Sequence, residues 1–294
     1  MPKIKGIYAA SLSILNPDLS LNVEKTISHS EKIIDQGCHG TAIFGSTGQA
    51  QLISVTEKIT FLNKLSTSKY KEKYIIGTGL NSLGETINLM KVAMSLNFKK
   101  FLIMPPAYYK YEDKEVIQFY TKIVETVPES EIILYNFEKL CGYKFSINCI
   151  KELVKRFPNQ IIGVKDSSYN LFEDLKLENF SILPGSELKL LKGLKLGCSG
   201  IITATCNVTA QLSRKVYDDF FSNNKQSYNK KLCEVRGVFD KFNLISGLHT
   251  FCSQDDQIYR NLLPPLRLLN QEEEKELMKD LKDLNFKIDS SMAA

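Results

Sequence analysis

Short apolar runs alternate along the chain with stretches of helical periodicity. The runs are predicted as strands, and several are almost purely apolar, which is typical of strands buried on both faces of a parallel sheet. They span residues 6–11, 40–45, 74–78, 100–104, 131–136, 161–165, 182–185 and 199–205. Between them apolar residues recur at i, i+3, i+4 and i+7, most clearly from Val116 to Val127, which indicates amphipathic helices.

Eight strand–helix units predict an α/β fold, a (β/α)₈ TIM barrel, because parallel strands are joined by right-handed helical crossovers. The alternative is a doubly wound open sheet, which usually carries Gly-x-Gly-x-x-Gly after its first strand. Here LSILNPDLS stands at that place. We therefore expect a catalytic barrel over residues 1–220. Residues 221–294 are expected to form a C-terminal helical extension packed on the barrel, with Leu232, Val235 and Phe239 on one helix face.

Composition and charge exclude several classes of protein. The net charge is only +5, from 38 basic and 33 acidic residues, and Arg and Lys do not cluster, so a nucleic-acid partner is not expected. No apolar run reaches about 18 residues, so no membrane span is expected. The N-terminus does not resemble a signal peptide, and the seven Cys lack Cys-x-x-Cys spacing; both indicate a cytoplasmic protein with reduced thiols. The three His lack ligand spacing, which argues against a metal site.

Three groups of polar residues follow predicted strands, where TIM barrels carry their chemistry. Lys165 follows the apolar run IIGV. It is either a solvent-exposed lysine or an amine nucleophile, which a desolvated barrel mouth favours because only the neutral amine attacks a carbonyl. Tyr135 is either a core residue or a proton shuttle. The turn Gly45-Ser46-Thr47-Gly48 is either a plain connection or a carboxylate-binding nest.

The order and spacing of these strand ends resemble the family of dihydrodipicolinate synthase and N-acetylneuraminate lyase, which also contains 2-keto-3-deoxygluconate aldolase. The motifs are Gly45-Ser46-Thr47-Gly48, Tyr135-Asn136, Gly163-Val164-Lys165-Asp166, Gly200-Ile201-Ile202-Thr203-Ala204-Thr205-Cys206-Asn207 and Leu263-Pro264-Pro265-Leu266. The resemblance implies a class I aldolase-type lyase. In such an enzyme a lysine forms a Schiff base with pyruvate, and no metal or other cofactor takes part.

The resemblance also implies a role for individual residues. Lys165 would form the Schiff base and Tyr135 would be the acid/base. Ser46 and Thr47 would bind the pyruvate carboxylate and relay protons to Tyr135. Tyr109, or its neighbour Tyr108, would reach across a subunit interface of a homotetramer built as a dimer of dimers. Further substrate contacts are expected at Gly48, Gly185, Glu187, Ile202 and Thr205.

Departures from the family pattern bear on the substrate. Gln49 stands where the family has Glu, and Glu138 where it has Pro. Dihydrodipicolinate synthases carry an Arg five residues after the catalytic Tyr, and here that position is Leu140, with Lys139 beside it expected to point elsewhere. We therefore expect reversible cleavage of a 2-keto-3-deoxy sugar acid or a sialic acid, with Glu187 holding substrate hydroxyls. The alternatives are 4-hydroxy-tetrahydrodipicolinate synthase, which joins pyruvate to aspartate semialdehyde, and a catalytically inactive keto-acid-binding barrel.

Overall fold

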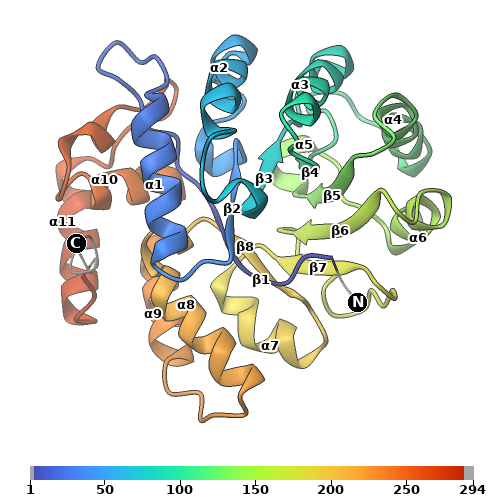
Figure 1. The fold of residues 1–294 in the computed structure, drawn as a ribbon. Helices are drawn as coiled ribbons and strands as arrows, with labels where there is room; N and C mark the ends of the chain where they lie inside the picture. Colours follow the sequence, from blue (N-terminus) through green and yellow to red (C-terminus); the bar gives the residue numbers. More distant parts are fainter. Residues whose placement is uncertain (1–2, 288–294) are drawn as a thin grey trace.

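Eight parallel strands form the centre of the molecule in the computed structural model, which describes residues 3–287 (Figure 1). The strands are β1 (Gly6–Ala10), β2 (Gly40–Ile43), β3 (Tyr74–Gly77), β4 (Lys100–Ile103), β5 (Glu131–Asn136), β6 (Ile161–Asp166), β7 (Ser181–Pro184) and β8 (Gly200–Thr203). Their hydrogen-bonded order runs from β7 down to β1 and on to β8. The ring closes where the Ser199 amide, just before β8, donates to the Ile182 carbonyl of β7 (2.9 Å). The predicted TIM barrel is confirmed.

Helices surround the strands on the outside (Figure 1). They are α1 (Val23–Asp35), α2 (Val55–Leu65), α3 (Leu83–Ser95), α4 (Asp113–Thr126), α5 (Glu138–Cys141), α6 (Ile147–Arg156), α7 (Leu190–Lys195) and α8 (Cys206–Phe221), with short 3₁₀ turns η1 (Ser46–Gly48), η2 (Lys71–Lys73) and η3 (Glu187–Lys189). Several begin at polar caps. In α2 the Ser54 hydroxyl accepts from the Glu57 amide while the Glu57 carboxylate accepts from the Ser54 amide. The expected apolar face of α4 is buried at Val116, Tyr120 and Ile123.

Two apolar layers hold the barrel together. The interior is filled from several strands by Ala42, Ile75, Leu102, Ile133 and Ile202, among others. A larger layer lies between the strands and α2, α3, α4 and α6. The interior filling means that the barrel is a packed core, and it leaves the strand ends as the place for polar chemistry.

The C-terminal extension consists of α9 (Asn229–Phe239), α10 (Leu244–Cys252), η4 (Gln257–Arg260) and α11 (Gln271–Asp283). It packs against one side of the barrel, next to α1 and α8 (Figure 1). Val235, Phe239 and Leu277 share an apolar cluster with Leu12 and Ala204 of the barrel. The expected end of the extension, residues 288–294, lies outside the described residues, as do residues 1–2 at the start of the barrel.

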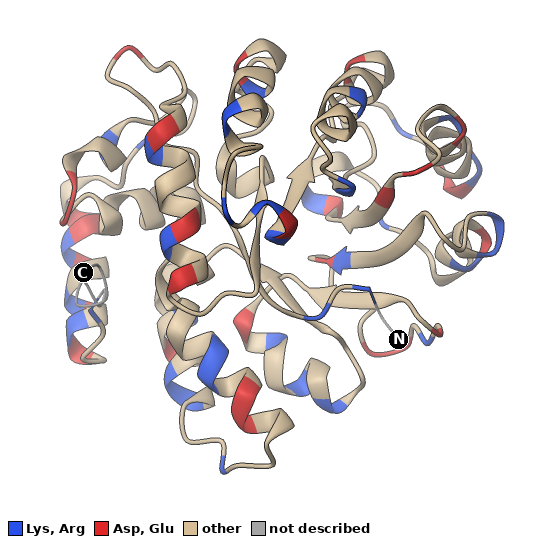
Figure 2. Ribbon diagram, in the orientation of Figure 1, with Lys and Arg blue, Asp and Glu red and all other residues tan. Residues whose placement is uncertain are grey.

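Charged residues lie mostly on the outer helices, where both signs alternate in the view of Figure 2. Within residues 3–287, no helix is both long and apolar enough to cross a membrane. Over the same residues, no group of three or more His, Cys, Asp and Glu side chains is arranged to hold a metal ion.

Candidate active site

Lys165 and Tyr135 end two neighbouring strands and lie side by side. They are paired in the register of β5 and β6, so both side chains leave the sheet on the same face. Lys165 is 3% exposed and Tyr135 is 4% exposed. The Lys165 Nζ lies 4.1 Å from the centroid of the Tyr135 ring. The structure therefore places an amine and a phenol, both nearly removed from water, at one point of the barrel mouth.

Ser46 connects this pair to the end of β2. It opens η1, and its Oγ is 2.9 Å from the Tyr135 hydroxyl. Thr47 is buried and lines the same cavity as Lys165. Of the two hydroxyls expected to relay protons, the one hydrogen-bonded to Tyr135 is that of Ser46.

Asp166 fixes the ends of β5 and β6. Its Oδ1 accepts from Asn136 Nδ2 (2.8 Å) and the Tyr169 amide (2.9 Å), while its Oδ2 accepts from the amides of Leu171 (2.9 Å) and Phe172 (3.0 Å). Burial raises the pKa of Asp166, although these hydrogen bonds act in the opposite direction. Since Asp166 follows Lys165 directly, this network holds the lysine at the cavity.

The catalytic cavity, as we name the space above Lys165 and Tyr135, has a volume of about 760 Å³. Its charged lining residues are Glu138, Lys139, Lys165, Lys189, Arg236 and Asp240. Glu138 is paired with Lys144 at 3.4 Å. Arg236 is paired with Glu187 and Asp240, whereas Lys139 and Lys189 form no ion pair within the described residues, so the lining is positive and favours anionic ligands. Lys139 lines the cavity, as does Leu140 beside it.

A buried ion pair joins the wall of this cavity to the extension. Arg236 Nη1 donates to Glu187 Oε2 at 2.9 Å, and Arg236 Nε donates to Asp240 at 2.8 Å. The Glu187 side chain is 0% exposed and that of Arg236 is 8% exposed. Burial alone would lower the pKa of Arg236, but Glu187 and Asp240 outweigh it and raise that pKa.

This ion pair gives Glu187 a different place from the one expected. Its Oε2 also accepts from the Thr203 hydroxyl (2.8 Å), and its Oε1 is within 3.3 Å of Thr209 Oγ1. Glu187 is not among the residues that line the catalytic cavity, whereas Arg236 is. The carboxylate therefore holds Arg236 instead of facing a substrate. Thr205 is buried in the same cluster, 3.4 Å from Arg236 Nη1.

The other expected substrate contacts lie at different depths. Gly185 lines the cavity, and a side chain there would collide with Ser167, since an added Cβ would be 2.2 Å from Ser167 Oγ. Gly48 packs against the end of β1, where an added Cβ would be 2.8 Å from the Ser11 carbonyl oxygen. Ile202 is buried in the interior cluster that contains Tyr135. Gly48 and Ile202 thus support the site from behind.

A side cavity of about 500 Å³ adjoins the catalytic cavity and shares Ser46, Tyr135, Leu140 and Ile245 with it. Its lining is largely apolar. Outside it, Tyr108 is 89% exposed and Tyr109 is 74% exposed, with ring centroids 5.1 Å apart. Neither tyrosine is among the residues that line the catalytic cavity or the side cavity.

The departures from the family motifs have local explanations. Gln49 Oε1 accepts from the Leu263 amide (2.8 Å), so the amide oxygen ties η1 to the Leu263-Pro264-Pro265-Leu266 segment. The Glu138 amide donates to Ser168 Oγ (2.9 Å), a bond that proline cannot make.

Sequence reasoning missed Arg236 and Lys189. A signal for Arg236 was present, because it shares a helix face with Leu232, Val235 and Phe239 at spacings of i, i+3, i+4 and i+7. An arginine within an apolar stripe needs a buried partner. Lys189 had no such signal, since it lies in a short 3₁₀ turn.

Comparison with known proteins identifies the family. Residues 3–284 match the model of the dihydrodipicolinate synthetase family. An uncharacterized DapA-like lyase of Chloroflexus aurantiacus is 26% identical over 283 residues, covering 92% of this chain and 94% of that protein. The 4-hydroxy-tetrahydrodipicolinate synthase of Methanoculleus marisnigri is 27% identical over 225 residues, covering 74% and 76%.

Solved structures share the fold at lower identity. The chain superimposes on the prophage protein YagE of E. coli K12, solved in complex with pyruvate, with a TM-score of 0.86, 22% identity and coverage of 97% and 100%. For dihydrodipicolinate synthase from Aquifex aeolicus the TM-score is 0.89, with 19% identity and coverage of 97% and 100%. The chain belongs to the dihydrodipicolinate synthetase family of lyases.

Proposed function

We propose that the protein cleaves a 2-keto-3-deoxy sugar acid reversibly to pyruvate and an aldehyde, through a Schiff base on Lys165. The observation that carries this is the contact of the buried Lys165 amine with Tyr135, whose hydroxyl is bound to Ser46. An inactive keto-acid-binding barrel would need neither a buried amine nor a phenol beside it. The solved complex of YagE with pyruvate supports pyruvate as the keto acid.

The chemistry follows from these groups. The neutral Lys165 amine attacks the C2 carbonyl of the substrate, Tyr135 gives its phenolic proton to the departing hydroxyl, and loss of water leaves an iminium ion and the Tyr135 phenolate. The phenolate takes the proton of the C4 hydroxyl, the C3–C4 bond breaks, and its electron pair passes to the iminium to give an enamine and a free aldehyde. Protonation of the enamine at C3 and hydrolysis of the resulting imine release pyruvate and restore the amine. The Ser46 hydroxyl transfers protons between Tyr135 and the cavity.

The lining of the cavity supports an aldehyde that itself carries an anionic group. Lys139, Lys189 and Arg236 all face the space beyond Lys165. This charge also favours a second candidate, condensation of pyruvate with aspartate semialdehyde, since the second substrate is a carboxylate. Against it, Leu140 supplies no guanidinium fork where that enzyme has its Arg. Hydrogen bonds to charged groups contribute about 1.5–3 kcal/mol, so we expect the sugar acid to be the better substrate.

Reductive trapping tests the Schiff base. Borohydride with pyruvate should add a three-carbon lactyl-type mass to the peptide that contains Lys165. Lys165→Ala should abolish both labelling and turnover. Lys139→Ala is the matched control, because it removes another lysine from the same cavity and should leave the labelling in place. Labelling on another peptide, or activity in Lys165→Ala, would overturn the assignment.

Substrate choice is tested by measuring kcat/KM for both reactions on one preparation. We expect release of pyruvate from a 2-keto-3-deoxy sugar acid whose aldehyde fragment carries an anionic group to outpace condensation with aspartate semialdehyde. Efficient condensation, with no pyruvate from any sugar acid, would favour the synthase and assign the second carboxylate to Lys139, Lys189 or Arg236.

A further inference from the structure

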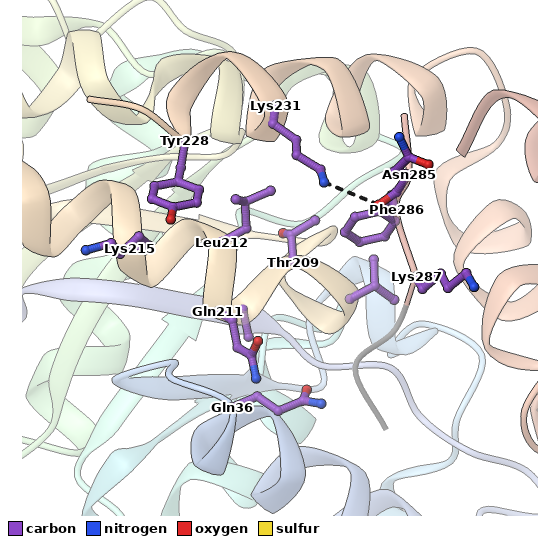
Figure 3. A pocket seen from close by; sticks show the side chains of 12 residues that line it. Gln36, Thr209, Gln211, Leu212, Lys215, Tyr228, Lys231, Asn285, Phe286 and Lys287 are labelled. Carbon is purple, nitrogen blue, oxygen red and sulfur yellow. Dashed lines mark hydrogen bonds between the residues drawn. The ribbon is translucent and has the colours of Figure 1, made fainter. Parts of the chain in front are cut away.

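A third cavity lies on the outside of the barrel, between α8, the start of α9 and the chain that follows α11 (Figure 3). This outer pocket has a volume of about 520 Å³ and shares no lining residue with the catalytic cavity or the side cavity. A space of this size is large enough for a small organic molecule.

The charge of the outer pocket has one sign. Its charged lining residues within the described chain are Lys215, Lys231 and Lys287. Lys231 reaches across the pocket, where its Nζ donates to the Asn285 carbonyl at 3.2 Å (Figure 3). Lys215 is paired with Asp219, whose side chain is 4% exposed and does not line the pocket. Between residues 3 and 287, Lys231 and Lys287 form no ion pair, so the described lining of the pocket is positively charged.

Apolar groups line the same space. Tyr228 and Phe286 lie on opposite sides of it, with Leu212 between them (Figure 3). The Phe286 ring is held by stacking on Phe251, with centroids 5.9 Å apart and an interplanar angle of 25°. The lining therefore combines cations with aromatic and aliphatic surface, which suits an anion with an apolar body.

The wall of the outer pocket is fixed from within. Thr209 has non-helical angles (φ −112°, ψ 16°) and interrupts α8 where α8 lines the pocket. Its Oγ1 lies 2.9 Å from the Thr205 carbonyl oxygen and 3.3 Å from Glu187 Oε1. Glu187 is also the carboxylate that holds Arg236 in the catalytic cavity. A ligand that contacts this turn therefore lies two hydrogen bonds away from Arg236.

We propose that the outer pocket binds a small organic anion with an aromatic or apolar body, and that this ligand is an effector of the catalytic cavity. The binding site is inferred from the volume and lining of the outer pocket alone. The effector role rests on the proposed function, and it passes through Thr209 and Glu187 to Arg236.

Calorimetric titration with phenyl phosphate tests the site. The probe supplies a ring and a dianion, whereas benzyl alcohol lacks the charge and inorganic phosphate lacks the ring, so both should bind more weakly. The variant Lys215→Gln/Lys231→Gln should bind phenyl phosphate at least tenfold more weakly. Its matched control, Lys139→Gln/Lys189→Gln, loses the same charge from the catalytic cavity and should bind at the outer pocket as the native protein does. The single variant Lys231→Gln keeps the Lys215–Asp219 pair. Its affinity for phenyl phosphate tests the site if the double variant is too unstable to measure.

The effector role is tested by titrating pyruvate with and without saturating phenyl phosphate. We expect the dissociation constant of pyruvate to change at least twofold in the native protein and to stay unchanged in Lys215→Gln/Lys231→Gln. Failure of the native protein to bind phenyl phosphate, or equal binding by that variant, would overturn the site. An unchanged pyruvate constant would overturn the effector role. Absence of pyruvate binding would count against the proposed function, and the phenyl phosphate titration would still decide the site.

Discussion

Replacing Glu187 by Leu separates two roles that a carboxylate behind the cavity can have. If Glu187 held substrate hydroxyls, its loss would raise KM and leave the stability of the protein unchanged. The structure instead places it in a buried ion pair with Arg236, supported by the Thr203 hydroxyl. We therefore expect Glu187→Leu to destabilise the fold.

The magnitude follows from the burial of both partners. The side chains of Glu187 and Arg236 are 0% and 8% exposed, so removing one leaves a charge in a desolvated place. Breaking such a pair costs about 3–5 kcal/mol, against a typical total stability of about 5–15 kcal/mol. Among the described residues Arg236 would keep the hydroxyls of Thr203 and Thr205 and one carboxylate, that of Asp240, whose side chain is 39% exposed and therefore screened by water.

Urea unfolding followed by circular dichroism measures this free energy. The double variant Glu187→Leu/Arg236→Met removes both charges and should recover much of the loss, because an apolar pair of similar volume often replaces a buried ion pair at little cost. It should remain impaired in turnover, since it lacks one of the cations that we propose for binding the anionic group of the aldehyde. A loss below about 1 kcal/mol in Glu187→Leu, the range of exposed pairs, would refute this reasoning.

Three further predictions concern the site, the acid stability and the assembly. Tyr135→Phe removes only the hydroxyl bound to Ser46, so turnover should fall about 10²–10⁴-fold while borohydride trapping partly survives; unchanged turnover would make Tyr135 a packing residue. Burial lowers the pKa of His29 and of His249 to about 4, so the folded protein holds both neutral. The contribution of the two neutral histidines to the free energy of unfolding should be fully present above about pH 6.5. It should fall towards pH 4 as the unfolded chain takes up the protons, by up to about 3 kcal/mol for each histidine. Equal urea midpoints at pH 7 and pH 4.5 would contradict this. If the ring of Tyr109 enters a partner's site, Tyr109→Ala should lower turnover and weaken assembly together. Steady-state kinetics measures the turnover, and sedimentation velocity measures the assembly.

The sequence was sufficient for the architecture because the barrel signals are local. Each predicted strand matches an observed one to within about two residues at its ends, for example 131–136 with Glu131–Asn136. The apolar runs determine the strands, and the periodic stretches determine the helices between them. The division at residue 220 falls at the end of α8, Phe221, although the extension shares a core with the barrel.

The site was predictable where a side chain ends a strand and less so elsewhere. The strand positions of Lys165 and Tyr135 predicted that both lie at the barrel mouth, because adjacent parallel strands bring their ends together. The roles proposed for them came from the resemblance to the family. The choice of Ser46 over Thr47 as the partner of Tyr135 depends on the dihedral angles of η1, which the pattern does not contain. Arg236 comes from a helix 49 residues beyond Glu187, so its arrival at the cavity depends on how the extension packs.

The absence of an Arg at Leu140 carries less weight once the structure is considered. Lys139 and Leu140 both line the cavity, because α5 is a single helical turn that runs along its edge. Cationic residues from three separate elements, α5, η3 and α9, line the same cavity as Lys165. A carboxylate or phosphate of the aldehyde could therefore be bound without the family's arginine, by Lys139, Lys189 or Arg236. Under the proposed function, discrimination between aldehydes would depend on the geometry of these three cations around a substrate bound at Lys165, and no single position in the sequence would determine it.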